Sequence, residues 1–174
     1  MHPAVVAAVL LLVGTINTVT AWSTDEVQKM CKDRNLESCG RGCKAGEWIR
    51  MDCDRCVKYF KIPSTFHEAQ DYCHSVNAEL VSIHNEEENI LVMCLSLKYN
   101  SDSQPQPFWS GGKRSGEGFI YTDGSEFDYA RWLPEQPDNH RGQEGCVEMN
   151  VWYWGSWNDQ NCSVKKDFFC QKRA

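Results

Sequence analysis

The residues best suited to chemistry lie between Glu135 and Asp159, in the stretch EQPDNHRGQEGCVEMNVWYWGSWND. Five side chains in it carry oxygen atoms that can coordinate a cation: Gln136, Asp138, Glu144, Asn158 and Asp159. Calcium prefers such ligands and takes about 6–8 oxygens from carboxylates, amide carbonyls and water. We therefore predict calcium as a cofactor, bound where two loops bring these five side chains together. For each residue taken singly, the competing interpretation is a solvated acidic loop beside core tryptophans.

The same acids have a second interpretation, as catalytic groups. Glu144 and Asp159 would then be the paired carboxylates of a glycosidase, but the residues around them form a pattern of metal ligands. A nucleophile motif of the G-x-S-x-G type does not occur in the sequence. We therefore expect a protein that is not an enzyme and has no catalytic residues.

Two tripeptides in this stretch, Gln136-Pro137-Asp138 and Trp157-Asn158-Asp159, resemble the QPD and WND motifs of the C-type lectin domain family. Glu144, two residues before a cysteine, stands where the family has its intervening acidic ligand. The resemblance covers roughly residues 43–172. It implies a cis peptide bond before Pro137 and direct ligation of a sugar by calcium, with two neighbouring hydroxyls hydrogen-bonded to the same five ligands.

The order of amide and acid around the proline bears on sugar preference. By resemblance, QPD implies glycans with terminal galactose or N-acetylgalactosamine, whereas EPN implies mannose-type ligands. Galactose binders of the family often carry a tryptophan shortly after QPD, but Asn139, His140 and Arg141 follow here. His140 is the residue in this segment that could stack on a sugar. A role in the innate recognition of microbes is one expectation for such a lectin.

The resemblance implies an α+β fold in which two helices flank antiparallel sheets, with a long calcium-binding loop and disulfide staples. Residue patterns place the first helix at 65–76, opened by a capping box of Thr65 and Glu68. A second helix is predicted from Asn85 to about Tyr99, with a buried stripe of Ile90, Leu91, Cys94 and Leu97. Strands are predicted near residues 48–51, 57–60, 78–83, 108–112, 119–125, 147–151 and 167–171.

The chain divides into three segments. Residues 1–21 are typical of a secretory signal peptide, because their apolar run of ten residues is too short to span a bilayer. Residues 22–42 are predicted to be an N-terminal extension outside the main core, with a short helix from Asp25 to Lys32. Residues 43–174 are the predicted C-type lectin domain. Because no later segment is long and apolar, we expect no membrane insertion and a secreted, extracellular protein.

All ten cysteines follow residue 30, which suits an oxidising compartment. The family pattern implies three bonds: Cys43–Cys56, Cys73–Cys170 and Cys146–Cys162. Four cysteines then remain, and their pairing is open: Cys31, Cys39, Cys53 and Cys94. Because clustered sites raise avidity, we expect a disulfide-linked homo-oligomer through Cys31 or Cys39. The alternative is five intrachain bonds, in which Cys53 and Cys94 could reach the extension.

Net charge and cysteine positions narrow the classes of partner. A formal charge of −6 disfavours nucleic acid and anionic membranes, since both attract basic surfaces. The resemblance leaves two other functions open. One is ice binding, as in fish type II antifreeze proteins, and the other is calcium-independent binding of a protein. Those antifreeze proteins carry extra cysteines close to the site, whereas the extra cysteines here lie outside residues 136–159.

Overall fold

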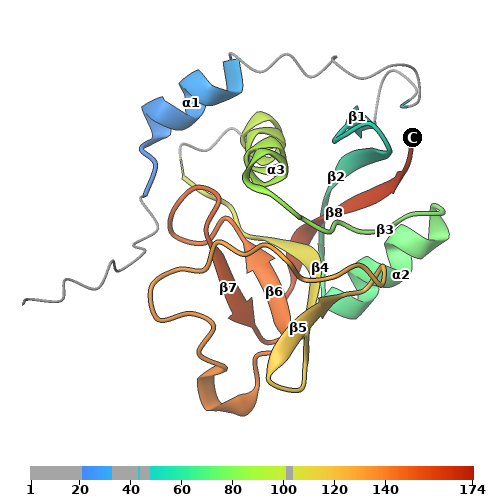
Figure 1. The fold of residues 1–174 in the computed structure, drawn as a ribbon, viewed down its shortest axis with the longest axis vertical. Coiled ribbons are helices and arrows are strands. Elements are labelled where there is room, and N and C mark those ends of the chain that lie inside the picture. Colours follow the sequence, from blue (N-terminus) through green and yellow to red (C-terminus); the bar gives the residue numbers. More distant parts are fainter. Residues whose placement is uncertain (1–20, 33–42, 44–47, 101–103) are drawn as a thin grey trace, which may run out of the picture.

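The structure is a computed structural model that describes residues 21–32, 43, 48–100 and 104–174. Its elements lie in one compact arrangement around a central sheet (Figure 1). The helices are α1 (Thr24–Lys32), α2 (Phe66–Ser75), α3 (Glu86–Tyr99) and the short η1 (His140–Gly142). The strands are β1 (Ile49–Arg50), β2 (Arg55–Ser64), β3 (Glu79–Leu80), β4 (Phe108–Ser115), β5 (Gly118–Tyr121), β6 (Cys146–Met149), β7 (Trp157–Gln160) and β8 (Lys166–Arg173).

The sheet is mixed rather than antiparallel throughout. Its strand order is β1-β2-β8-β4-β6-β7, with β3 paired to β8 and β5 paired to β4. The pair β4–β8 is parallel, whereas the other strand pairs are antiparallel. The expected antiparallel pairing therefore holds except at β4–β8, because the last strand returns to the centre of the sheet and runs beside β4 in the same direction.

Helix α2 begins where the sequence predicts. The Thr65 hydroxyl accepts a hydrogen bond from the Glu68 amide at 3.3 Å, and the Glu68 carboxylate accepts one from the Thr65 amide at 2.8 Å. Both amides would otherwise lack a partner in the first helical turn. The buried face of α2 packs against one half of the sheet, including Trp109 and Phe168. The capping box and the helix predicted from it are confirmed.

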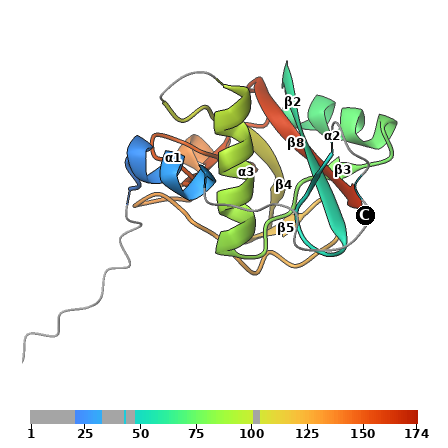
Figure 2. The same ribbon diagram turned by 90° about the horizontal axis from the view of Figure 1, so that it is seen from above.

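Helix α3 is buried on two sides, not along the single predicted stripe. Leu91 and Leu95 belong to the main core beneath the sheet. Ile90, Cys94 and Leu97 instead pack in a separate cluster with residues of α1. Figure 2 shows α1 lying alongside α3. The four predicted stripe residues are packed, but three of them face a second layer, supplied by the N-terminal segment, that covers the outer face of the helix.

The described part of the N-terminal extension is consequently packed against the domain. Val27 of α1 is fully buried, and the Trp154 indole donates a hydrogen bond to the Thr24 hydroxyl at 3.4 Å. A disulfide between Cys31 and Cys94 ties α1 to α3. This part packs with α3 in the separate cluster rather than in the main core, because apolar side chains at helical spacing give α1 a face to bury.

The disulfides settle part of the cysteine assignment. The structure contains all three bonds implied by the resemblance, Cys43–Cys56, Cys73–Cys170 and Cys146–Cys162. Because Cys31 is bonded to Cys94 within the chain, a covalent dimer through Cys31 is a wrong prediction, and the alternative that Cys94 reaches the extension is confirmed. Cys53 is also disulfide-bonded. Cys39 lies outside the described residues, as do residues 1–20 of the predicted signal peptide.

Candidate functional site

The candidate site forms where the long loop between β5 and β6 meets β7. Gln136, Asp138 and Glu144 come from that loop, which lies at the lower left of Figure 1, and Asn158 and Asp159 come from β7. Oxygen atoms of the Asp138, Glu144 and Asp159 carboxylates lie within 4.8 Å of one another. In the described part of the chain, no other group of acids, histidines and cysteines meets this geometry.

A cavity of about 260 Å³ opens beside this acidic cluster. Four of the five predicted ligands line it, namely Gln136, Asp138, Glu144 and Asn158, and so does His140. The fifth, Asp159, is fully buried. The remaining lining residues are Leu133, Val151 and Trp152. The structure thus brings all five predicted ligands and His140 to one place.

Main-chain amides tie the loop to β7. The Asp138 and Asn139 amides donate to the two carboxylate oxygens of Asp159, at 3.1 and 3.0 Å. The Asp138 amide also lies 3.1 Å from the side-chain oxygen of Gln136. The peptide bond between Gln136 and Pro137 is cis, as the resemblance implies. These contacts position the QPD tripeptide directly against the WND tripeptide.

His140 contributes to the site through its main-chain amide. Its amide donates to Asp138 Oδ1 at 3.1 Å and to Glu144 Oε2 at 2.9 Å. The Glu144 amide in turn donates to Asn139 Oδ1 at 3.1 Å. One N–H group therefore holds two of the three carboxylates together, a role that sequence reasoning about the imidazole did not include.

The loops around the site carry most of the strained backbone. Six non-glycine residues in the described part of the chain have positive φ, and only Asn77 lies away from the site. The other five are Glu135, Asn139, Arg141, Asn150 and Trp152. Asparagine tolerates this region, whereas bulkier residues pay a conformational cost. Such conformations persist where surrounding contacts over-determine them, and this concentration marks the loops as a functional region.

The environment of Glu144 perturbs its carboxyl group. Burial raises the pKa of Glu144, and the negative charges of Asp138 and Asp159 raise it further. Two carboxylates in contact resist simultaneous ionisation unless a positive charge lies near them. An all-oxygen donor set with excess negative charge suits a hard cation such as calcium. The residues present therefore fit the cofactor that the sequence predicts.

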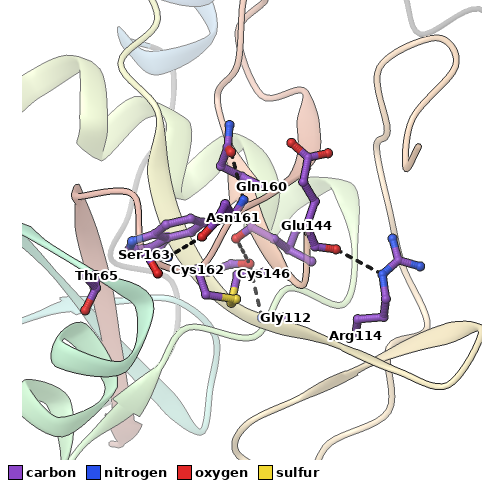
Figure 3. Close-up of a disulfide and its surroundings, with 12 residues drawn as sticks. Thr65, Gly112, Arg114, Glu144, Cys146, Gln160, Asn161, Cys162 and Ser163 are labelled. Carbon is purple, nitrogen blue, oxygen red and sulfur yellow. Dashed lines mark hydrogen bonds between the residues drawn. A yellow bond between two sulfur atoms is a disulfide. The ribbon is translucent and has the colours of Figure 1, made fainter. Parts of the chain in front are cut away.

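Arg114 on β4 supplies a counter-charge that sequence reasoning missed. Its guanidinium forms an ion pair with Asp159 Oδ2, and its Nε donates to the main-chain carbonyl of Glu144 at 3.1 Å. Figure 3 shows Arg114 directed at that carbonyl, beside the Cys146–Cys162 disulfide. The three carboxylates and one guanidinium leave two net negative charges, which matches a divalent cation. No local sequence signal marks Arg114, which precedes Asp159 by 45 residues.

A second buried ion pair lies behind Asn158. The Asn158 side-chain amide donates to Glu148 Oε1 at 2.8 Å, and Lys166 Nζ lies 2.6 Å from Glu148 Oε2. Sequence analysis also passed over these two charged residues. One signal in the sequence could have indicated the pair. Glu148 is an acid between Val147 and Met149, in a strand predicted to be central.

The four aromatic residues of the stretch divide between core and surface. Trp154 and Trp157 are buried, whereas Trp152 is 79% exposed and lines the cavity. Tyr153 is 46% exposed but does not line the cavity. The loop that presents Trp152 is braced by the Asn150 side chain, which accepts a hydrogen bond from the Gly155 amide at 2.9 Å. A broad aromatic face is thereby held next to the acidic cluster.

None of the described helices is long and apolar enough to cross a membrane.

Comparison with known proteins gives a consistent set of similarities. Residues 62–172 match the Lectin C-type domain. C-type isolectin Sp-CL4 from Scorpaena plumieri is 44% identical over 140 residues, which cover 80% of this chain and 92% of that protein.

A second relative and a solved structure extend the comparison. The galactose-specific lectin nattectin from Thalassophryne nattereri is 32% identical and covers 80% of this chain and 83% of its own length. The solved structure of herring type II antifreeze protein superposes with a TM-score of 0.66 at 30% identity. That superposition covers 76% of this chain and 99% of the herring protein.

Proposed function

The chain belongs to the C-type lectin domain family, and on that premise we propose that it is a secreted lectin that binds sugars through calcium. Its ligands are glycans with terminal galactose or N-acetylgalactosamine. The observation that carries the proposal is the convergence of three carboxylates beside a cavity that two side-chain amides also line. Four disulfides between described residues support an oxidising, extracellular location.

The five predicted ligands would hold the cation: Gln136, Asp138, Glu144, Asn158 and Asp159. Bound calcium supplies coordination sites for two neighbouring sugar hydroxyls. The chain's own groups complete the recognition, because carboxylates accept hydrogen bonds from the hydroxyls and amide N–H groups donate to them. His140 and Trp152, on the cavity wall, would contact the rest of the sugar.

Glycan-array binding measured with calcium, with saturating EDTA, and after calcium is restored tests this function. We expect binding to galactose-terminated glycans that is lost in EDTA and recovered with calcium. Burial and the charges of Asp138 and Asp159 raise the pKa of Glu144, and a bound cation would offset the repulsion among these carboxylates. Binding that survives saturating EDTA would contradict the calcium mechanism.

Exchanging acid and amide around Pro137 should change the sugar preference. In the double variant Gln136→Glu/Asp138→Asn, both the number of ligands and the net charge are unchanged. We therefore expect calcium affinity within a few-fold of wild type, and preference shifted from galactose towards mannose. The measurement is competitive elution by the two sugars. An unchanged sugar ranking would show that contacts other than these two residues set specificity.

Trp152 should contribute to sugar affinity without affecting calcium. An exposed indole beside the site can cover the apolar face of a sugar ring and remove apolar surface from water, which favours binding. We expect Trp152→Ala to weaken galactose binding about 10-fold, equivalent to about 1.4 kcal/mol. Tyr153→Ala is the matched control, because Tyr153 is the exposed neighbour that does not line the cavity. Equal losses in the two variants would count against a specific role for Trp152.

Ice binding is the second candidate, favoured by the similarity to the herring antifreeze protein. Thermal hysteresis measured on the same preparation separates it from sugar binding. A lectin is expected to show calcium-dependent glycan binding and no hysteresis. Hysteresis without glycan binding would replace the proposed function with the antifreeze one.

A further inference from the structure

Glu148 is a buried acid placed directly behind one of the amides proposed to bind calcium. It is 2% exposed and lies on β6, opposite Asn158 in the antiparallel pair β6–β7. This register brings Asn158 Nδ2 to 2.8 Å from Glu148 Oε1. The two residues therefore form a cross-strand pair, and the backbone pairing of β6 with β7 fixes their positions.

The chemistry of this contact decides which end of the amide faces the acid. An ionised carboxylate only accepts hydrogen bonds, so only the NH₂ end of Asn158 can face Glu148. Asn158 also lines the cavity. Its carbonyl oxygen is therefore left for a cation there, and one of its two N–H groups is left for a ligand hydroxyl.

Lys166 forms an ion pair with the acid. Its ammonium lies 2.6 Å from Glu148 Oε2, and both side chains are largely buried. The Lys166 ammonium also lies 5.5 Å from the centre of the Trp109 ring, within range of a cation–π contact. A buried carboxylate without such a partner would be costly. The ion pair and the hydrogen bond together hold the Asn158 amide in one orientation.

We propose that Glu148, paired with Lys166, is a positioning residue that sets the orientation of the Asn158 amide and so presents its oxygen to calcium. This inference rests on the proposed function. It also refines sugar recognition, because one Asn158 N–H is already used by Glu148. Asn158 can therefore donate to a single sugar hydroxyl.

The variant Glu148→Gln tests the orientation without changing side-chain size. Lys166 can only donate, so it attracts the oxygen of the new amide and turns its NH₂ end towards Asn158. Asn158 must then present its own oxygen to position 148 and its NH₂ to the cavity. We expect calcium affinity, measured by calorimetric titration without sugar, to fall about 10- to 100-fold, the range seen for residues that support metal ligands.

A reciprocal exchange should restore binding. In Glu148→Gln/Asn158→Asp, the new acid accepts from the new amide and leaves its second oxygen for calcium, while net charge equals that of wild type. We expect affinity within a few-fold of wild type. The control Glu148→Gln/Gln136→Glu adds the same charge to a different ligand and should recover less. Equal recovery in both double variants would overturn the orientation mechanism.

Glu88→Gln separates orientation from the general loss of a buried ion pair. Glu88 is buried and pairs with Arg55 at 2.8 Å, but it does not line the cavity. Its variant should unfold at a lower temperature with unchanged calcium affinity. If wild type binds calcium and Glu148→Gln binds it equally well, this inference alone fails. If wild type binds no calcium, the proposed function fails, and the inference fails with it.

Discussion

Glu144→Gln is expected to weaken calcium binding about 100-fold and to raise the stability of the calcium-free protein. Two unit charges 4 Å apart interact by about 4 kcal/mol at an effective dielectric constant of 20, and partial exposure reduces this value. The Glu144 carboxylate attracts calcium but repels the carboxylates of Asp138 and Asp159, which raise its pKa together with burial. The same substitution should therefore have opposite effects on metal affinity and on unfolding in EDTA. Calorimetric calcium titration and thermal unfolding measure the two effects.

Glu126→Gln is the matched control for this experiment. Glu126 is exposed and is not part of the acidic cluster, so its variant loses the same charge away from the site. We expect wild-type calcium affinity and stability from it. A Glu144→Gln variant that was destabilised in EDTA would show that hydrogen bonds to the Glu144 carboxylate outweigh the repulsion.

Arg114→Met is expected to destabilise the calcium-free protein by about 3–5 kcal/mol, the usual cost of leaving one member of a buried ion pair alone. Its partner, Asp159, has no exposed surface. Calcium would replace the lost positive charge beside the cluster. The destabilisation should therefore be smaller when calcium is present, and urea unfolding with calcium and with EDTA measures both values.

Lys113→Met provides the comparison for Arg114→Met. Lys113 precedes Arg114 on β4 but is exposed, so its loss should change stability little in either condition. If Arg114→Met unfolds like wild type in EDTA, the ion pair with Asp159 is not needed. If calcium leaves its destabilisation unchanged, the cation does not neutralise Asp159.

Local sequence patterns predicted where the helices lie better than they predicted which elements pack against them. The start of α2 followed from Thr65 and Glu68 because a capping box is completed within four residues. The sequence did not reveal that α1 covers Ile90, Cys94 and Leu97 of α3, because α1 lies more than fifty residues away and is held there by contacts and the Cys31–Cys94 bond. Similarly, the regular strand within the predicted 78–83 is β3, Glu79–Leu80, whose two residues are in register with β8, while Val81 adds one amide hydrogen bond to Phe169.

The tryptophans show the same division. The number and clustering of the tryptophans are plain in the sequence. Their spacing, however, does not tell that Trp152 is exposed and Trp154 is buried. Trp154 is buried against the N-terminal segment, whereas Trp152, with φ of 54°, is turned out beside the cavity. A loop conformation held by Asn150 and Ser156 makes this distinction, and no periodic pattern reports such a conformation.

The sequence by itself determined the family and the candidate ligands, because the QPD and WND tripeptides, the acid between them and the cysteine frame are short patterns of residue type. Only the tertiary structure decided which charges stand behind those ligands. Arg114 reaches Asp159 and Glu148 reaches Asn158 from separate strands, and Lys166 in turn reaches Glu148. The physical reason is that ligand identity is a property of single side chains. Their charge balance and orientation depend on strand register, which forms only when the whole sheet is assembled.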